Sequence, residues 1–128
     1  MSDLLVATRI SNPEEPRFKR VVSCWEQCRL EYQFVSEPWT GIMAKLQAAV
    51  KMAQKTSKKY MLFVDGYDTI TLGTEEQIID RFKRFQHPFV CMAERNCWTQ
   101  EILKIHYGNP QTPWWYLNAG AFMVDVEY

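Results

Sequence analysis

The sequence has little that would direct it to a membrane. Its first ten residues contain an acid, Asp3, where a signal peptide carries basic residues. The apolar run that follows is too short for a leader or for a membrane span. We therefore expect no membrane partner and a cytoplasmic location, which a microbial or viral origin would explain.

The sequence also lacks a net charge of either sign. Fifteen basic and fifteen acidic residues cancel, so no overall field would attract nucleic acid. The short basic runs at 17–20 and 55–59 are expected to be solvated helix ends. We therefore expect no nucleic-acid partner.

The four cysteines lack the spacing of a metal site. Cys24 and Cys28 stand four residues apart, on one face of a predicted helix, and no pair forms a C-x-x-C motif. The two histidines are not at zinc-finger spacing either. Free structural thiols are the expectation, with a disulfide or a zinc site as the alternatives.

What the sequence does contain is a regular alternation of apolar runs and helical patterns. Continuous apolar runs predict buried strands, and apolar residues at three- and four-residue steps predict helices. The predicted strands are 4–10, 31–35, 60–64, 89–93 and 116–126, and the predicted helices are 15–29, 42–53 and 74–87. The segment 94–116 is aperiodic, and we expect an irregular loop there with a short helix near 99–105.

This alternation predicts an α/β fold, a mostly parallel sheet with helices on both faces. A length of 128 residues with 47% hydrophobic content fits one domain, covering 1–128. Thr74 followed by Gln77 is a capping box that predicts the start of the third helix, and Pro88 predicts its end.

Two carboxylates follow the third predicted strand. Asp65 is the first polar residue after it, and Asp68 comes three residues later. In an open α/β sheet, ligands bind beyond the carboxyl ends of the strands. Mg²⁺ and Mn²⁺ bind through one or two carboxylates together with water and substrate phosphate. The pair therefore indicates half of a metal–diphosphate site.

Two other interpretations of the "DGYD" stretch stay open. It could be a plain turn, with an Asx bond from Asp65, a positive φ at Gly66 and Asp68 as a cap. It could also belong to a haloacid-dehalogenase-like phosphatase, in which a nucleophilic Asp follows an apolar strand. That motif needs a second acid two residues later, where this chain has Tyr67.

Three further segments carry a resemblance. "FVDGYDTITLG" at 63–73, "AERNCW" at 93–98 and "YLNAGAF" at 116–122 occur in that order, preceded by "WTG" at 39–41 with Lys45. In this order they resemble the glycosyltransferase domain of procollagen lysyl hydroxylases and the related collagen glucosyl- and galactosyltransferases. The resemblance covers roughly residues 36–124.

The resemblance implies a GT-A-like, Rossmann-like fold and a nucleotide-sugar site. Asp65 and Asp68 would hold Mn²⁺, or Mg²⁺, against the diphosphate of a UDP-sugar, and Tyr67 would stack on or flank the uracil. Trp39 and Lys45 would line the nucleotide side, unless they are a surface-packed aromatic and a solvated helix lysine.

The donor sugar would meet a second group of residues. The loop beside the donor sugar would consist of Asn118, Ala119 and Gly120, unless these residues form a plain turn. Glu94 could face the cleft. Cys97 and Trp98 match the family pattern, and packing is the expected role of both. The implied reaction is transfer of a hexose from the UDP-sugar to a hydroxyl acceptor on a protein or glycan. The alternative is a non-catalytic α/β module descended from such an enzyme.

The chain departs from the family pattern after its last strand. The family domain continues through an acidic cluster, an acceptor half and a histidine metal ligand, whereas this sequence ends at Tyr128. Both His87 and His106 precede that strand, and Ala121 stands where the family often has a second Gly. We expect a truncated or minimal version, the donor-binding half, which a partner chain or a second copy could complete.

Overall fold

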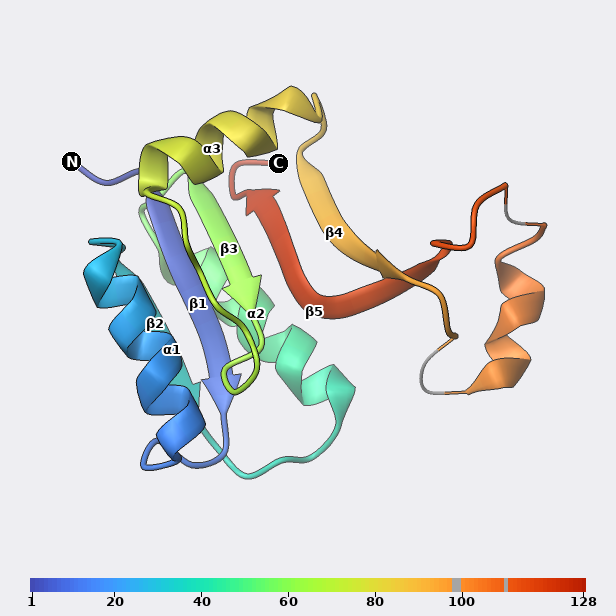
Figure 1. Ribbon diagram of the computed structural model, residues 1–128, viewed down its shortest axis with the longest axis horizontal. Helices are drawn as coiled ribbons and strands as arrows, with labels where there is room; N and C mark the ends of the chain where they lie inside the picture. The colour runs from blue at the N-terminus through green and yellow to red at the C-terminus, as the bar shows by residue number, and fades with distance from the viewer. Residues whose placement is uncertain (98–99, 110) are drawn as a thin grey trace.

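The computed structural model describes residues 1–97, 100–109 and 111–128. A five-stranded sheet has the strand order β2-β1-β3-β5-β4 (Figure 1). The strands are β1 (Leu4–Ile10), β2 (Tyr32–Ser36), β3 (Tyr60–Val64), β4 (Phe89–Glu94) and β5 (Tyr116–Asp125). The helices are α1 (Pro16–Gln27), α2 (Ile42–Lys55), α3 (Glu75–Arg84) and a 3-10 helix, η1 (Glu101–His106).

The sheet is mostly parallel, as predicted. β1 pairs in parallel with β2 and β3, whereas β5 is antiparallel to both β3 and β4. β4 therefore points the same way as the first three strands, and only β5 among these five strands runs in the opposite direction. The predicted α/β class is confirmed. The insertion of β5 between β3 and β4 was not predicted, because strand order depends on long-range pairing.

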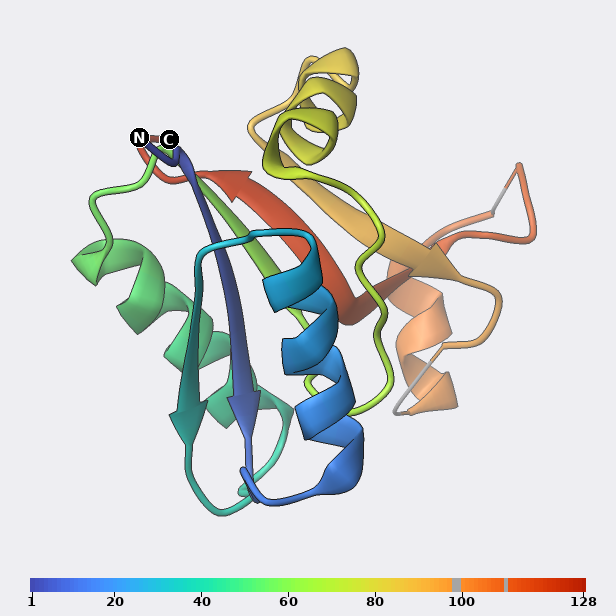
Figure 2. The ribbon, with the colours of Figure 1, turned by 60° about the vertical axis from the view of Figure 1, so that its left-hand side comes forward.

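One face of the sheet is closed by two helices. α1 and α3 lie over this face (Figure 2). Alternate residues of β1 and β3 pack against them. Trp25 of α1 is completely buried, and the ring of Tyr60 lies 5.7 Å from the ring of Phe82 in α3. The amphipathic patterns that predicted these helices therefore provide this part of the core.

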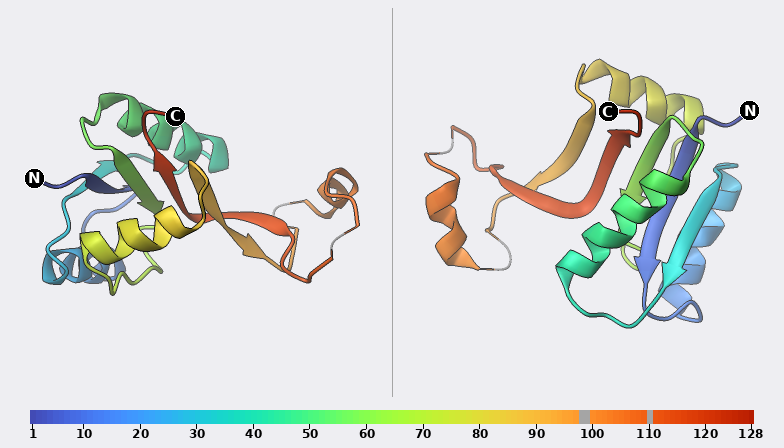
Figure 3. Two further views of the ribbon diagram at one scale, coloured as in Figure 1. Left: turned by 90° about the horizontal axis from the view of Figure 1, so that it is seen from above. Right: turned by 180° about the vertical axis from the view of Figure 1, so that it is seen from behind.

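Among the described helices, α2 is the one that covers the opposite face. Leu5 and Met61 point to this face and pack with Met52 of α2, and the rings of Phe63 and Phe122 stack 5.2 Å apart. Seen from behind, α2 lies over β1 and β3, and none of the described helices lies over β5 and β4 (Figure 3). We call this uncovered face of β5 and β4 the open strip.

Two helices end earlier than predicted. Arg29 adopts a left-handed φ of 55° two residues after α1, and Gln86 adopts 51° two residues after α3, so both helices end in a left-handed residue. Phe85, predicted on the apolar stripe, is consequently 64% exposed. The predicted capping box between Thr74 and Gln77 is confirmed.

The long connection between β4 and β5 extends away from the body, as Figure 1 shows. The predicted short helix near 99–105 corresponds to η1, a 3-10 helix, and its predicted first residue lies outside the described residues. The ring of Trp114 lies under the guanidinium of Arg95, at 5.8 Å. Cys97 is buried, in agreement with a packing role, while Trp98 is not among the described residues.

The four cysteines are free thiols, as predicted. Within the described ranges, no group of three or more His, Cys, Asp and Glu side chains is placed to hold a metal ion. None of the helices in those ranges has the length and apolar character needed to cross a membrane.

Candidate functional site

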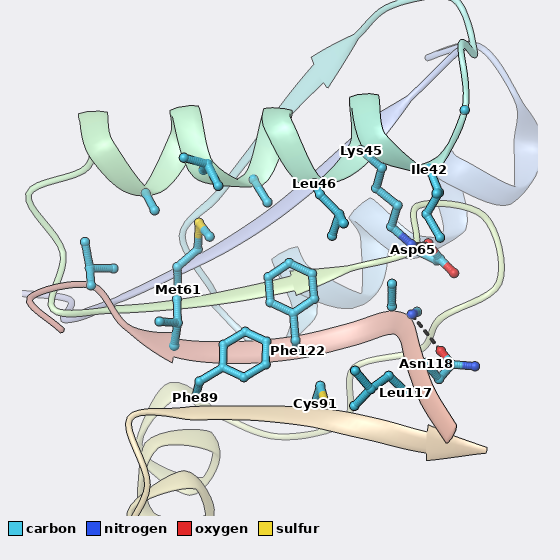
Figure 4. A pocket seen from close by; sticks show the side chains of 18 of the residues that line it. Ile42, Lys45, Leu46, Met61, Asp65, Phe89, Cys91, Leu117, Asn118 and Phe122 are labelled. Atoms are coloured by element: carbon cyan, nitrogen blue, oxygen red, sulfur yellow. Dashed lines mark hydrogen bonds and ion pairs between the residues drawn. The ribbon is translucent and has the colours of Figure 1, made fainter. Parts of the chain in front are cut away.

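A pocket of about 1040 Å³ lies between α2 and the open strip (Figure 4). This volume is just above the usual range for small-molecule sites, about 300–1,000 Å³. Most of its wall is apolar and includes Leu46, Met61 and Phe122. Four polar or charged side chains meet at one end: Lys45, Asp65, Glu94 and Asn118.

Asp65 stands directly after β3 and enters this polar end, as the sequence predicted. Its N–H donates to the carbonyl of Gly120 at 2.8 Å, and its own carbonyl accepts from the Thr69 hydroxyl at 2.5 Å. These bonds fix the backbone on both sides of the residue. The carboxylate is 39% exposed and forms an ion pair through Oδ1 with Nζ of Lys45.

The plain-turn interpretation of "DGYD" is wrong in two respects. The Asp65 carboxylate binds Lys45, and Gly66 is not among the residues with positive φ. Glycine is required at this position by space, because a Cβ would lie 2.3 Å from Cγ2 of the buried Ile10. The turn is therefore pressed against the end of β1.

Lys45 reaches the site from the inner face of α2. It lies three and four residues from Ile42 and Ala49, which line the same pocket, as expected for neighbours on one helix face. Its side chain is only 10% exposed. The alternative of a solvated helix lysine is therefore wrong. A buried ammonium group needs an anionic partner, and Asp65 provides it.

Asn118 links the second carboxylate of the site to β5. Its Oδ1 accepts from the N–H of Gly120 at 2.6 Å, and its Nδ2 donates to Oε2 of Glu94 at 3.2 Å. Glu94 is the last residue of β4 and lines the pocket together with Ala119. The predicted cleft position of Glu94 is therefore observed.

A bend in β5 brings these groups together, and sequence reasoning missed it. Cys91 of β4 pairs with Phe122, but the next residue, Met92, pairs with Asn118, so 119–121 have no β4 partner. Figures 1 and 4 show the bend in β5. There β5 approaches β3, and the N–H of Asp65 donates to the carbonyl of Gly120. Irregular pairing of this kind redirects side chains beside functional sites. The small residues at 119–121 were the available signal.

Gly120 is needed where β5 crosses the end of β3. A Cβ on this residue would lie 2.6 Å from Oδ1 of Asn118 and 3.2 Å from Oδ2 of Asp65. A larger residue would have to displace Asn118 from its bond to the Gly120 N–H. The small size of Gly120 therefore lets β5 pass close to the end of β3, whereas its predicted role beside the donor sugar stays a prediction.

Trp39 and Gly41 form the mouth of the pocket beside the start of α2. Trp39 lines the pocket and is 63% exposed. Gly41 is the N-cap of α2 with φ of 111°, and no side chain of the described residues caps this helix start. The first N–H groups of α2 are thus available at the pocket. Gly41 was not predicted beyond its place in the "WTG" segment.

Tyr67 and Asp68 do not line the pocket. The Tyr67 hydroxyl accepts from the backbone N–H groups of Ser11 and Asn12 at 2.9 and 2.8 Å, and the Arg17 guanidinium lies 5.3 Å from its ring. Burial raises the pKa of Tyr67, but the hydrogen bonds from Ser11 and Asn12 outweigh it, and the pKa lies below its ordinary value. Asp68 is exposed. The predicted roles of both residues stay predictions.

The comparisons with known proteins cover much of the chain. A family described as "PLOD GT domain" matches residues 41–128. "Uncharacterized protein R699" of Acanthamoeba polyphaga mimivirus is 31% identical over 110 residues, which cover 73% of this chain and 24% of that protein. The chain thus spans about a quarter of the length of this relative.

A solved structure has the same fold. The chain described as "Crystal Structure of A197 from STIV" superposes with a TM-score of 0.60 at 15% identity, covering 97% of this chain and 65% of that one. At this identity the likeness concerns the fold alone. The family match covers more than half of the sequence, including Lys45, Asp65, Glu94 and Asn118. The protein therefore belongs to the PLOD GT domain family, the glycosyltransferase domain of the procollagen lysyl hydroxylases.

Proposed function

We propose that the protein binds a UDP-sugar in the pocket between α2 and the open strip, as the donor site of a metal-dependent glycosyltransferase. The observation that carries the proposal is the meeting of Lys45, Asp65, Glu94 and Asn118 at one end of a pocket of ligand size. These groups lie beyond the carboxyl end of β3, where open α/β sheets bind ligands.

Two features support binding of the diphosphate. Lys45 provides an ammonium group with three donors, and it is held on the pocket side of α2. The start of α2 adds free N–H groups and the positive end of the helix dipole beside Gly41. Anionic oxygens bound between them would lie next to the Asp65 carboxylate.

The residues present fit a divalent ion that is shared with the nucleotide. Such ions use one or two protein carboxylates and complete their shell with phosphate and water. Asp65 would be one ligand. Its Oδ1 binds Lys45, and its Oδ2, which lies beside Gly120 at the pocket, would be the oxygen for the ion. Asp68, three residues further along the same turn, does not line the pocket and would have to turn toward it to be the second ligand. When bound, Mn²⁺ or Mg²⁺ would stabilise the negative charge of the departing diphosphate.

The sugar would lie between Asn118 and Glu94. A carboxylate and an amide side by side can accept from and donate to neighbouring hydroxyl groups of a hexose. Gly120 leaves the space for the sugar to approach the backbone. The acceptor hydroxyl, on a protein or glycan, would approach from the solvent side of the pocket. Trp39, which is exposed and lines the pocket, would provide an aromatic ring for stacking with the uracil.

Calorimetric titration with UDP in the presence of Mn²⁺, and separately in EDTA, tests the proposal. We expect UDP to bind weakly in EDTA and more tightly with Mn²⁺, and we expect Asp65→Asn to weaken the binding with Mn²⁺ by more than about tenfold, because a metal ligand is lost. Asp80→Asn is the matched control, since Asp80 is an exposed residue of α3 paired with Arg84. A parallel Asp68→Asn variant tests the second proposed ligand. Absence of UDP binding under every condition would contradict the proposal and favour the non-catalytic module.

A further inference from the structure

The charges at the polar end of the pocket are unequal. Among the described residues that line the pocket, Lys45 is the sole basic one, whereas Asp65 and Glu94 both contribute carboxylates. Lys45 binds one of these carboxylates directly, and its side chain is 10% exposed. Glu94 is held by Asn118 instead. One ammonium group therefore lies beside the carboxylate that is proposed to bind the metal.

A divalent ion and a diphosphate change this balance in opposite directions. An ion that arrives alone at Asp65 adds positive charge beside the Lys45 ammonium group. A diphosphate that arrives alone adds negative charge beside two carboxylates. When both bind, their charges largely compensate. Charges a few ångströms apart in a partly buried site interact strongly, so each ligand should bind better in the presence of the other.

We infer that Lys45 couples metal binding to nucleotide binding at this site, an inference that rests on the proposed function. Lys45 holds Asp65 until a nucleotide diphosphate offers its ammonium group a second anionic partner. The carboxylate is then free to hold the divalent ion. A lysine suits this role because its charge is compact and its stem is flexible. The coupling acts in both directions, as linkage between two ligands requires.

Two separate titrations test the inference without any measurement of turnover. Mn²⁺ alone and UDP in EDTA are each titrated by calorimetry into the wild type and into Lys45→Met. We expect the variant to bind Mn²⁺ about tenfold more tightly, because a competing cation is gone, and UDP about tenfold more weakly, because a phosphate partner is gone. General damage to the fold would weaken both ligands, so the opposite signs are diagnostic.

Three further variants complete the test. Lys45→Arg keeps a positive charge beside Asp65, so it should not show the tighter Mn²⁺ binding expected of Lys45→Met. Lys51→Met changes an exposed lysine of the same helix and should alter neither affinity. Lys45→Gln repeats the comparison if the methionine variant does not fold.

The outcomes separate this inference from the proposed function. Unchanged or weaker Mn²⁺ binding by Lys45→Met would overturn the coupling, even if the wild type binds UDP with Mn²⁺. A wild type that binds no UDP under any condition would overturn both.

Discussion

Alternate residues of β1 and β3 point to opposite faces of the sheet, and the two faces meet different numbers of helices. Leu4 and Val6 pack under α1 and α3, whereas Leu5 and Ala7 pack under α2 alone. A helix with its side chains is about 10–12 Å across, and neighbouring strands are about 4.8 Å apart. One helix therefore covers about two strands, which leaves β5 and β4 open beside α2. The pocket lies in the space that a second helix would fill.

The first prediction contrasts a core residue of the closed face with a residue of the open strip. Trp25→Ala should lower the free energy of unfolding by about 3–5 kcal/mol, because Trp25 is completely buried. Phe89→Ala should lower it by about 1 kcal/mol, because Phe89 is 44% exposed in the pocket wall. Urea denaturation measures both. Equal losses would mean that the open strip is covered in solution.

The second prediction concerns the turn after β3, which contains Gly66. Gly66→Ala should lower the free energy of unfolding by about 1–3 kcal/mol, because the new Cβ would lie 2.3 Å from Ile10 Cγ2. Gly73→Ala is the control, since the nearest atom to its new Cβ, on Ile78, is 3.3 Å away. Thermal denaturation compares the two variants. A smaller loss for Gly66→Ala than for the control would refute the steric argument.

The third prediction separates packing from binding at the bend in β5. In Gly120→Ala the new Cβ would displace Asn118, and we expect UDP–Mn²⁺ affinity to fall about tenfold. The free energy of unfolding should fall by only about 1 kcal/mol, because Asn118 is at the pocket and can turn toward water. Calorimetry and urea denaturation on the same samples give both values. Unchanged affinity would mean that the bend in β5 is not part of the donor site.

The smallest expected effect lies away from the pocket. Tyr67→Phe removes the acceptor for the N–H groups of Ser11 and Asn12 and should lower the free energy of unfolding by about 0.5–1.5 kcal/mol. The pKa of Tyr67 lies below its ordinary value, so the wild type should gain stability over the variant as pH rises through that lowered pKa toward 10. Urea denaturation at pH 7 and pH 9.5 checks both points. A gap that narrows with pH would contradict the lowered pKa.

Local patterns in the sequence predicted most elements of the fold. The apolar runs placed the strands, the amphipathic steps placed the helices, and the capping box of Thr74 and Gln77 placed the start of α3. The "FVDGYD", "AERNCW" and "YLNAGAF" segments indicated the family that the match over 41–128 confirms. These features are encoded within a few neighbouring residues, which is why they could be predicted.

The helix ends show where such patterns fail. Arg29 and Gln86 end α1 and α3 in the left-handed conformation, although glycine is the usual signal for it. The predicted helices, 15–29 and 74–87, therefore extend beyond the observed ends at Gln27 and Arg84. Phe85, assigned to the apolar stripe, lies beyond the end of α3 and is exposed.

Local patterns were enough to specify the elements, the α/β class and the position of Asp65 at the end of a buried strand. Tertiary structure decided that Lys45 neutralises Asp65, that β5 bends between β3 and β4 to bring Asn118 and Glu94 to the same place, and that Tyr67 points to another part of the molecule. The residues of these pairs lie far apart along the chain. Lys45 and Asp65 are 20 residues apart, and Glu94 and Asn118 are 24 apart. No local periodicity specifies such pairs. They form because strand pairing and the cover of α2 leave a pocket with one polar end on the open face.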